Sequence, residues 1–391
     1  MSYPEIVEYE FRKLYGETPT LVRSPGRVNL IGEHTDYNLG FVLPAAIDKA
    51  IYFAIGPRND QECRTYALDM KDFHEFGTDN LALSTKGWPN YLMGVVDQMV
   101  KSGYRVAGFN CVFGGDIPIG AGVSSSAALE AGLAFALNRL FDLGMDSLSL
   151  AKLAQKAENE FVGVRCGIMD QYANIFGLTN NVLRIDCRSL EHTYYPFDSR
   201  TVSVVLFDTG VSHSLASSEY NRRREECAEG VSVIRTRYPH VASLRDATAA
   251  MLEECASRMT GAVYRRCRYV VEENVRVVQA CACLEKGDLK AFGSLMRKSH
   301  EGLRDYYEVS CRELDYLAEA TVGEPGVYGS RMMGGGFGGC TINVVDNAMV
   351  EDLCTMIAEK YEQEFDIRLQ SYVMSIGSGT DQVSVKESLI L

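Results

Sequence analysis

The feature that most constrains the fold is a glycine- and serine-rich segment between an expected strand and an expected helix. Residues 118–128 read PIGAGVSSSAA, in which two glycines are separated by one residue and three serines follow. Glycine lets a backbone turn tightly and approach a ligand closely. A helix that begins after such a turn presents unpaired N–H groups and a partial positive charge, which suit a phosphate. A phosphate-binding turn is one interpretation, and a small-residue helix start packed on a sheet is the other.

This turn differs from the two commonest nucleotide-binding patterns. The chain contains no Gly-Lys dipeptide, so the turn is not a P-loop. The third glycine of the dinucleotide-binding fingerprint is also missing. Ser126 could offer a hydroxyl to Mg²⁺, a hard ion that prefers oxygen. The serines also suit capping of the helix that we expect to continue to Gly144.

A second segment, residues 26–38, reads GRVNLIGEHTDYN. Glu33, His34 and Asp36 place hydrogen-bonding side chains within four residues, directly after an apolar stretch. Sugar hydroxyls both donate and accept, and carboxylates accept from them with charge-assisted strength. The segment therefore suits a polyol site, with an ordinary polar turn as the alternative.

A third segment, residues 331–340, reads RMMGGGFGGC and has five glycines in six positions. Such a run carries a large entropic cost on folding, which is tolerable where a backbone passes close to a ligand or another strand. A flexible hinge is the alternative interpretation. The apolar strand expected at 341–345 favours an ordered loop.

Length and charge limit the classes of function. A chain of 391 residues exceeds the usual size of a single core, so two domains are expected. Its composition, 46% hydrophobic and 23% charged, is that of an ordinary globular protein. The net charge of −13 disfavours nucleic-acid binding and docking on anionic membranes.

The chain shows neither a signal peptide nor an apolar run long enough to span a bilayer. We therefore expect a cytoplasmic protein whose twelve cysteines are free thiols, mostly acting as small apolar filler. Their spacing does not favour structural zinc. No obligate protein partner is implied.

Periodicity predicts an α+β protein of two lobes. We expect helices over 4–15, 90–102, 124–144, 149–163 and 168–177, and mostly helix over 219–317. Strands are expected over 50–56, 109–114, 201–208, 339–345 and 369–376. Residues 20–36 look like a strand, a turn and a second strand, and a change of domain is expected near 190–200.

The three segments, in this order, resemble the GHMP kinase family, and GRVNLIGEHTDYNLG is similar to the galactokinase signature. The likeness runs over nearly the whole chain. It implies a two-lobed GHMP kinase fold. A mixed-sheet N-terminal domain would cover residues 1–195, an α/β-sandwich (ferredoxin-like) C-terminal domain would cover 196–391, and the active site would lie between them.

The resemblance also implies an activity: transfer of the γ-phosphoryl group of MgATP to the C1 hydroxyl of galactose. It implies that ATP phosphates contact Gly120, Ala121, Gly122, Val123, Ser124, Ser125 and Ser126, and that Mg²⁺ contacts Ser126 and Glu158. It implies catalytic roles for Asp170 and Arg27. The sugar would contact Glu33, His34, Thr35, Asp36, Gly167 and Tyr220.

Without the resemblance, these residues have plainer interpretations. Asp170 would be a first-turn helix acid, and Glu158 and Arg27 would be surface charges. The arginines after Tyr220 are expected on a solvated face, with an Arg222–Glu226 pair at i,i+4 spacing. An ionised carboxylate is a weak base for an alcohol, so we expect the proton to move late and orientation to matter as much as basicity.

Two positions differ from the family pattern: Met333 stands where Thr is usual and Val123 where Leu is usual. Met333 is expected to alter packing under the nucleotide loop. A kinase for N-acetylgalactosamine or arabinose remains an alternative on the same fold. So does a catalytically silent galactose sensor, but that would be expected to damage the SSSAA loop or the catalytic carboxylate, and both are intact here.

Overall fold

The computed structural model describes residues 1–118, 120–212 and 216–384. In this part of the chain a six-stranded sheet has the order β13-β1-β3-β6-β4-β5. All its neighbours pair antiparallel except β4 and β6, which are parallel. Its strands are β1 (Thr20–Asn29), β3 (Pro44–Pro57), β4 (Glu62–Ala67), β5 (Asp72–Gly77), β6 (Phe109–Gly115) and β13 (Asp381–Val383).

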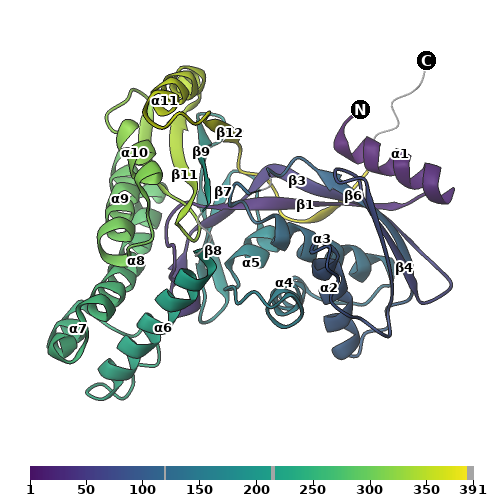
Figure 1. The fold of residues 1–391 in the computed structure, drawn as a ribbon, viewed down its shortest axis with the longest axis horizontal. Helices are drawn as coiled ribbons and strands as arrows, with labels where there is room; N and C mark the ends of the chain where they lie inside the picture. Colours follow the sequence, from purple (N-terminus) through teal and green to yellow (C-terminus); the bar gives the residue numbers. More distant parts are fainter. Residues whose placement is uncertain (119, 213–215, 385–391) are drawn as a thin grey trace.

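Helices cover both faces of this sheet (Figure 1). Strand residues alternate between the faces, so Leu21 packs against α1 whereas Val22 packs in the core below α2 and α3. The helices of this half are α1 (Tyr3–Tyr15), α2 (Pro89–Lys101), α3 (Ser125–Leu140), α4 (Ser147–Lys156), the π-helical η2 (Ala157–Val162) and α5 (Met169–Phe176).

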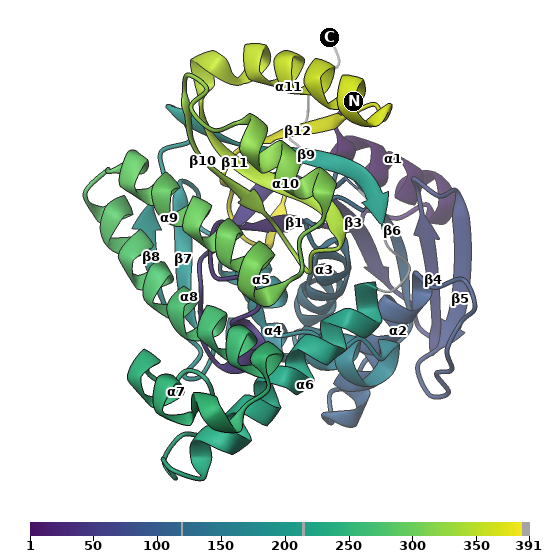
Figure 2. The same ribbon diagram turned by 60° about the vertical axis from the view of Figure 1, so that its left-hand side comes forward.

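The second half is built on a four-stranded antiparallel sheet of order β10-β11-β9-β12. In Figure 1 its helices lie together at the left of the molecule, and in Figure 2 α6 extends from α7 and α8 toward the N-terminal half. The strands are β9 (Val202–Ser212), β10 (Val327–Met332), β11 (Gly338–Asp346) and β12 (Gln370–Met374). The helices are α6 (Ala216–Arg235), α7 (Ala249–Cys255), η3 (Ala256–Arg258), α8 (Gly261–Glu285), α9 (Leu289–Gly302), η4 (Leu303–Tyr307), α10 (Arg312–Ala320), η5 (Asn347–Met349) and α11 (Val350–Phe365).

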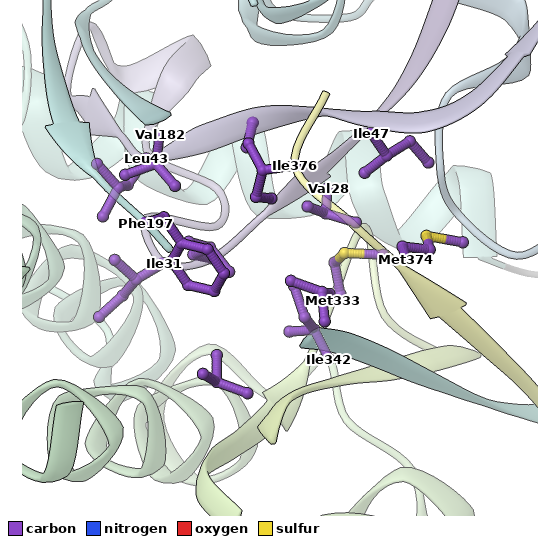
Figure 3. Close-up of a cluster of buried hydrophobic side chains, with 14 of the residues drawn as sticks. Val28, Ile31, Leu43, Ile47, Val182, Phe197, Met333, Ile342, Met374 and Ile376 are labelled. Atoms are coloured by element: carbon purple, nitrogen blue, oxygen red, sulfur yellow. The ribbon is translucent and has the colours of Figure 1, made fainter. Parts of the chain in front are cut away.

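A small third sheet and a shared core join the halves. The third sheet has the order β2-β7-β8, and its elements are β2 (Phe41–Val42), β7 (Asn181–Asp186) and β8 (Glu191–Pro196). In the core, Val28 and Ile47 from the first sheet pack in one cluster with Ile342 and Met374 from the second (Figure 3). Ile376, just after β12, is buried in the same cluster.

Residues 20–29 form one strand, so the expected turn within this segment is wrong. The register of β1 against β3 shifts between Pro25 and Arg27, which marks a β-bulge in a continuous ladder. A Cβ at Gly26 would lie 2.9 Å from the carbonyl oxygen of Val123. Glycine is therefore needed here because the glycine- and serine-rich turn that contains Val123 packs directly on the bulge.

Most long helices are confirmed, with changes at their ends. The helix expected to reach residue 144 ends at Leu140, and the one expected over 149–163 is α4 continued by η2. Short strands β2, β4, β5, β7, β8, β10 and β13 were not predicted. All twelve cysteines are free thiols, and none of them is exposed. Among the described residues, every helix is too short or too polar to cross a membrane.

Candidate active site

Arg27 joins the glycine- and serine-rich turn to the candidate catalytic carboxylate of Asp170. Its Nε and Nη2 donate to the two oxygens of Asp170 at 2.7 and 2.8 Å. Its Nη1 donates to the carbonyl oxygen of Gly122 at 2.6 Å, and its backbone N–H donates to that of Val123 at 3.1 Å. The Arg27 side chain is 8% exposed and that of Asp170 is 24% exposed. Neither is a simple surface charge, and the bulge of β1 places the guanidinium between the two elements.

Ser124 connects the same two elements. It is the N-cap residue of α3 in a left-handed conformation, with φ of 57°, and its side chain makes no capping hydrogen bond. Instead its hydroxyl donates to Asp170 Oδ2 at 2.5 Å. The hydroxyl residues at the start of this helix were expected to suit capping, but the serine at the N-cap makes no such bond. The turn and the Asp170 carboxylate are in direct contact, on the side of α5 that faces the start of α3.

The rest of the turn has the backbone shape that its glycines predict. Gly120 and Gly122 both have positive φ, of 87° and 71°. Ala121 and Val123 point inward and are buried, whereas Ser125 and Ser126 begin α3. The Met333 side chain lies 4.0 Å from the position of a Cβ on Gly122, so it packs beneath the turn.

Glu158 and Ser126 offer oxygens beside the turn. Glu158 is buried at the start of η2, and Gln171 Nε2 donates to its Oε2 at 2.7 Å. Burial, followed by the charge of Asp170, raises the pKa of Glu158, and its hydrogen bonds with Cys166, Ser126 and Gln171 oppose this rise. Burial, followed by the charge of Glu158, also raises the pKa of the adjacent Glu130.

Burial and neighbouring acids disfavour the ionised forms of Glu158 and Glu130. A divalent cation beside them would favour those forms. The described residues hold no group of three or more His, Cys, Asp or Glu placed to bind a metal. Mg²⁺ that arrives with a nucleotide needs only one or two protein oxygens, because phosphates and water complete its shell. Ser126 and Glu158 thus suit Mg²⁺ bound together with ATP.

Glu33 links the second segment, residues 26–38, to the glycine loop, residues 334–339. Its Oε1 accepts from the Gly334 backbone N–H at 2.8 Å and from Arg331 at 3.2 Å, and its Oε2 accepts from Asn29 at 3.0 Å. These bonds use three of the four lone pairs of the carboxylate. The glycine loop is consequently ordered by contacts with the second segment, as the ordered-loop interpretation requires.

His34 sits in an aromatic cluster formed by both halves. Its Nδ1 is 2.7 Å from the Tyr37 hydroxyl, which is 2.8 Å from the hydroxyl of Tyr307. The ring of Tyr220 lies 5.5 Å from the His34 ring, centroid to centroid. The buried Nε2 has no hydrogen bond of normal geometry to any described residue. Burial, followed by the charge of Arg223, lowers the pKa of His34 to about 3, so the ring is neutral.

Asp36 and Gly167 are in close contact beside this aromatic cluster. A Cβ at Gly167 would lie 1.8 Å from Asp36 Oδ2, so the backbone before α5 presses against this carboxylate. Burial raises the pKa of Asp36 to about 6. The charges of Asp170 and Glu33 raise it too, whereas the Tyr37 N–H and Arg224 lower it.

Two predicted sugar residues have different surroundings. The Thr35 hydroxyl contacts the carbonyl oxygens of Gly32 at 2.8 Å and Phe41 at 2.6 Å, and the residue is fully buried. The Thr35 hydroxyl is therefore used within its own turn and does not join the Asp36–Gly167 contact. Tyr220 does lie near Asp36: its ring is 5.5 Å from the Tyr37 ring, centroid to centroid, and burial, followed by the charge of Asp36, raises its pKa.

The expectation of a solvated arginine face on α6 holds for one arginine but is wrong for the next. Arg222 is 63% exposed and pairs with Glu226 at 3.3 Å, as predicted. Arg223 is only 6% exposed and donates to the carbonyl oxygens of Tyr307 and Glu308, each at 2.8 Å. Those acceptors are distant in sequence, so local spacing could not reveal them.

Sequence reasoning also missed three residues beside the site: Tyr37, Gln171 and Arg224. Tyr37 follows Asp36 within the second segment, and Gln171 follows Asp170. Arg224 lies one helical turn after Tyr220, so i,i+4 spacing on a helix was the available signal.

Three family models match the chain. The galactokinase galactose-binding signature covers residues 9–57, and the N-terminal and C-terminal GHMP kinase domains cover 90–178 and 280–363. The fold is shared with a crystal structure of Methanococcus jannaschii mevalonate kinase, which is 16% identical with a TM-score of 0.66 over 92% of this chain and 99% of that one. Fold and site together define a GHMP kinase.

More similar relatives narrow this class. Galactokinase from Roseiflexus sp. (strain RS-1) is 43% identical over 377 residues, which is 95% of each chain. Galactokinase from Thermotoga maritima is 37% identical over 93% of this chain and 99% of that one. The crystal structure of Lactococcus lactis galactokinase complexed with galactose is 34% identical, with a TM-score of 0.91 over 96% and 98% of the two chains. The chain belongs to the galactokinase family, and it is a sugar kinase that uses ATP.

Proposed function

We propose that this protein transfers the γ-phosphoryl group of MgATP to the C1 hydroxyl of α-D-galactose, which gives galactose 1-phosphate and ADP. The observation that carries the proposal is the position of Asp170. Arg27 and Ser124 hold its carboxylate between the phosphate turn and the loop that presses on Asp36. An acceptor hydroxyl at this carboxylate would face a phosphate bound at the turn.

Arg27 positions Asp170 and can also meet the transferred group. A guanidinium has five N–H donors, and Asp170 and Gly122 accept from three of them, which leaves two. These two would stabilise the charge on the phosphoryl group as it moves, in a reaction that depends chiefly on positioning and electrostatics.

Asp170 would orient the C1 hydroxyl and then take its proton. Its Oδ2 already accepts two hydrogen bonds, whereas its Oδ1 accepts one, from Arg27. The second lone pair of Oδ1 is the one that the sugar hydroxyl would use. Because an ionised carboxylate is a weak base for an alcohol, the proton would move late, as the oxygen bonds to phosphorus.

Ser126 and Glu158 would hold Mg²⁺, and the N–H groups of residues 120–126 would hold the phosphates. The ion neutralises phosphate charge when it is bound. Glu33, His34, Asp36, Gly167 and Tyr220 would contact the sugar, with Thr35 shaping their turn. A cytoplasmic location, as proposed for the chain, agrees with twelve unpaired thiols, since disulfides are rare in reducing compartments.

The direct test gives the purified protein MgATP and a panel of sugars: galactose, its C4 epimer glucose, N-acetylgalactosamine and arabinose. ADP release is measured, and NMR assigns the carbon that carries the new phosphate. We expect fast turnover with galactose, phosphate on C1, and loss of turnover when EDTA removes Mg²⁺. Preferential turnover of another sugar, or phosphate at another carbon, would contradict the proposal.

A further inference from the structure

A cavity of about 1130 Å³ opens beside residues 37–39, and residues of both halves line it. Tyr37 and Cys166 line it from the N-terminal half, and Tyr220, Arg224 and Gly335 line it from the C-terminal half. Of the candidate sugar residues Tyr220 lines it, whereas Asp36 and Gly167 do not, so the cavity adjoins the Asp36–Gly167 contact rather than enclosing it.

Arg224 reaches across this cavity from α6. Its guanidinium carbon lies 5.2 Å from the centroid of the Tyr37 ring, within the range of a cation–π contact. Its Nη1 donates to the carbonyl oxygen of Arg165. Both partners belong to the N-terminal half, whereas Arg222, two residues earlier, pairs within its own helix.

Arg224 differs from its neighbours in having no acidic partner. It forms no ion pair with any residue that the structure describes, although both preceding arginines do. Its charge instead acts on a backbone carbonyl, an aromatic ring and the nearby Asp36. An ordinary solvated arginine gains little from a fixed position, because ordering its long side chain costs entropy. The fixed position here thus indicates a role at the site.

The Arg165 carbonyl that Arg224 binds lies in a loop, residues 163–168, that leads to the contact between Gly167 and Asp36. Other backbone hydrogen bonds of this loop stay local: Gly163 N–H donates to Glu158 O, and Cys166 N–H donates to Asn159 Oδ1, each at 2.9 Å. The loop ends where Gly167 presses on Asp36, just before the helix that carries Asp170.

We propose that Arg224 is a positioning residue for the sugar acceptor: by joining the Arg165 carbonyl to α6 and covering the Tyr37 ring, it holds the 163–168 loop against Asp36. The proposal rests on the proposed function, because it assigns Arg224 to the same sugar site. It adds a contact between the two halves that sets the shape of one wall.

The charge of Arg224 gives the proposal a second consequence. The groups that act on Asp36, or feel its charge, come from every element around it: Glu33, the Tyr37 N–H, Arg27, Asp170, Cys187, Tyr220 and Arg224. Arg224 is a cation in this set and favours the ionised carboxylate. Its removal should shift the acidic limb of kcat/KM for galactose to higher pH.

The test compares Arg224→Ala and Arg224→Lys with the control Arg222→Ala, which alters an exposed arginine of the same run. We expect Arg224→Ala to raise the KM for galactose about tenfold and to leave the KM for ATP within about twofold. Arg224→Lys, which keeps the charge, should restore part of the loss and return the acidic limb toward that of the unchanged protein. Arg222→Ala should behave like the unchanged protein.

Hydrogen exchange of the 163–168 segment provides an independent readout. It should become faster in Arg224→Ala but not in Arg222→Ala, at equal thermal stability. Matching galactose KM values in the two alanine variants, with matching exchange, would overturn the role of Arg224. Equal increases in KM for galactose and ATP would also overturn it, in favour of a general structural effect. Lack of galactose turnover by the unchanged protein would instead defeat the proposed function itself.

Discussion

At the scale of single residues, Asp36 is an acid of the sugar site whose ionisation depends strongly on its surroundings. Burial, with help from Asp170 and Glu33, raises its pKa from 3.8 to about 6. The carboxylate form is the one that accepts hydrogen bonds from sugar hydroxyls with charge-assisted strength. His34, whose pKa is lowered to about 3, stays neutral over the same range and adds no second transition.

We therefore expect kcat/KM for galactose to fall as the pH drops below about 6, the value to which the pKa of Asp36 is raised. Asp36→Asn should lower kcat/KM and remove this limb, with little change in the KM for ATP. Stability should respond with a defined sign. Between about pH 4 and 6 the folded protein keeps a proton that the unfolded chain has released, so folding weakens as pH rises through this window. An Asn variant with an unchanged acidic limb would show that another group titrates.

Asp170 leads to a second prediction at this scale. Asp170→Asn should reduce kcat by about 10²–10⁴-fold, the usual contribution of a positioned general base. Galactose should still bind, because its other contacts remain, and calorimetry can measure that binding. Ser124→Ala, which removes one hydrogen bond to the same carboxylate, is a milder control and should retain more turnover. Turnover near that of the unchanged protein in Asp170→Asn would contradict the assignment.

At the scale of elements, the glycine loop at 334–339 shows why particular glycines are required. Gly334 and Gly336 both have positive φ, of 86° and 84°. A Cβ on Gly334 would meet no atom within 4 Å, whereas a Cβ on Gly336 would lie 2.1 Å from the carbonyl oxygen of Val309. That carbonyl also accepts from the Phe337 N–H at 2.7 Å, so the loop is held tightly there.

Replacing each of these glycines by alanine separates the two costs. Gly334→Ala should lower the free energy of unfolding by about 1–2 kcal/mol, the cost of a left-handed conformation for a residue with Cβ. Gly336→Ala should cost at least about 2 kcal/mol more, because backbone atoms must also move. Urea unfolding would measure both. Equal losses would mean that the Val309 contact is unimportant.

Elements also show what could be predicted from the sequence. Long helices such as α1 and α2 were predictable because their apolar residues repeat with helical period and end at a glycine. Strands such as β5 and β8 were missed because they are short and bury at most one residue each, which leaves little periodic pattern. The bulge in β1 resembled a turn, because Pro25-Gly26 is a common turn signal.

The candidate site, too, could be predicted only in part. Its residues could be proposed from local motifs and from the family resemblance, since each motif is contiguous. The contacts between motifs could not be derived, because they depend on tertiary packing. Ser124 turning away from its helix to reach Asp170 is one example, and the burial of Arg223 against two distant carbonyls is another.

At the scale of the whole molecule, the two halves share one core. Ile376 is 2% exposed and packs with residues of both large sheets, although it follows the last strand of the second. Division of the chain into residues 1–195 and 196–391 stays a proposal about architecture. The shared core predicts that the halves, however divided, do not unfold separately.

Ile376→Ala tests this coupling, because the single tryptophan, Trp88, lies before α2 in the N-terminal half. A buried Ile→Ala change costs about 2–5 kcal/mol, and the loss should lower the urea midpoint of Trp88 fluorescence and of circular dichroism together. Val373→Ala is the matched control, because this residue is 44% exposed on β12. A Trp88 midpoint that does not move while the dichroism midpoint does would show independent halves.

The pairing of β13 with β1 has a consequence for how the molecule is made. Arg23 lies opposite Asp381, and Leu21 lies opposite Val383. The pairing of β1 on this side can therefore form only after β13 has been synthesised. Until then the outer edge of β1 exposes unpaired N–H and C=O groups that another chain can join. A partly synthesised chain therefore carries an open strand edge that the folded protein covers, and such an edge favours aggregation before folding is complete.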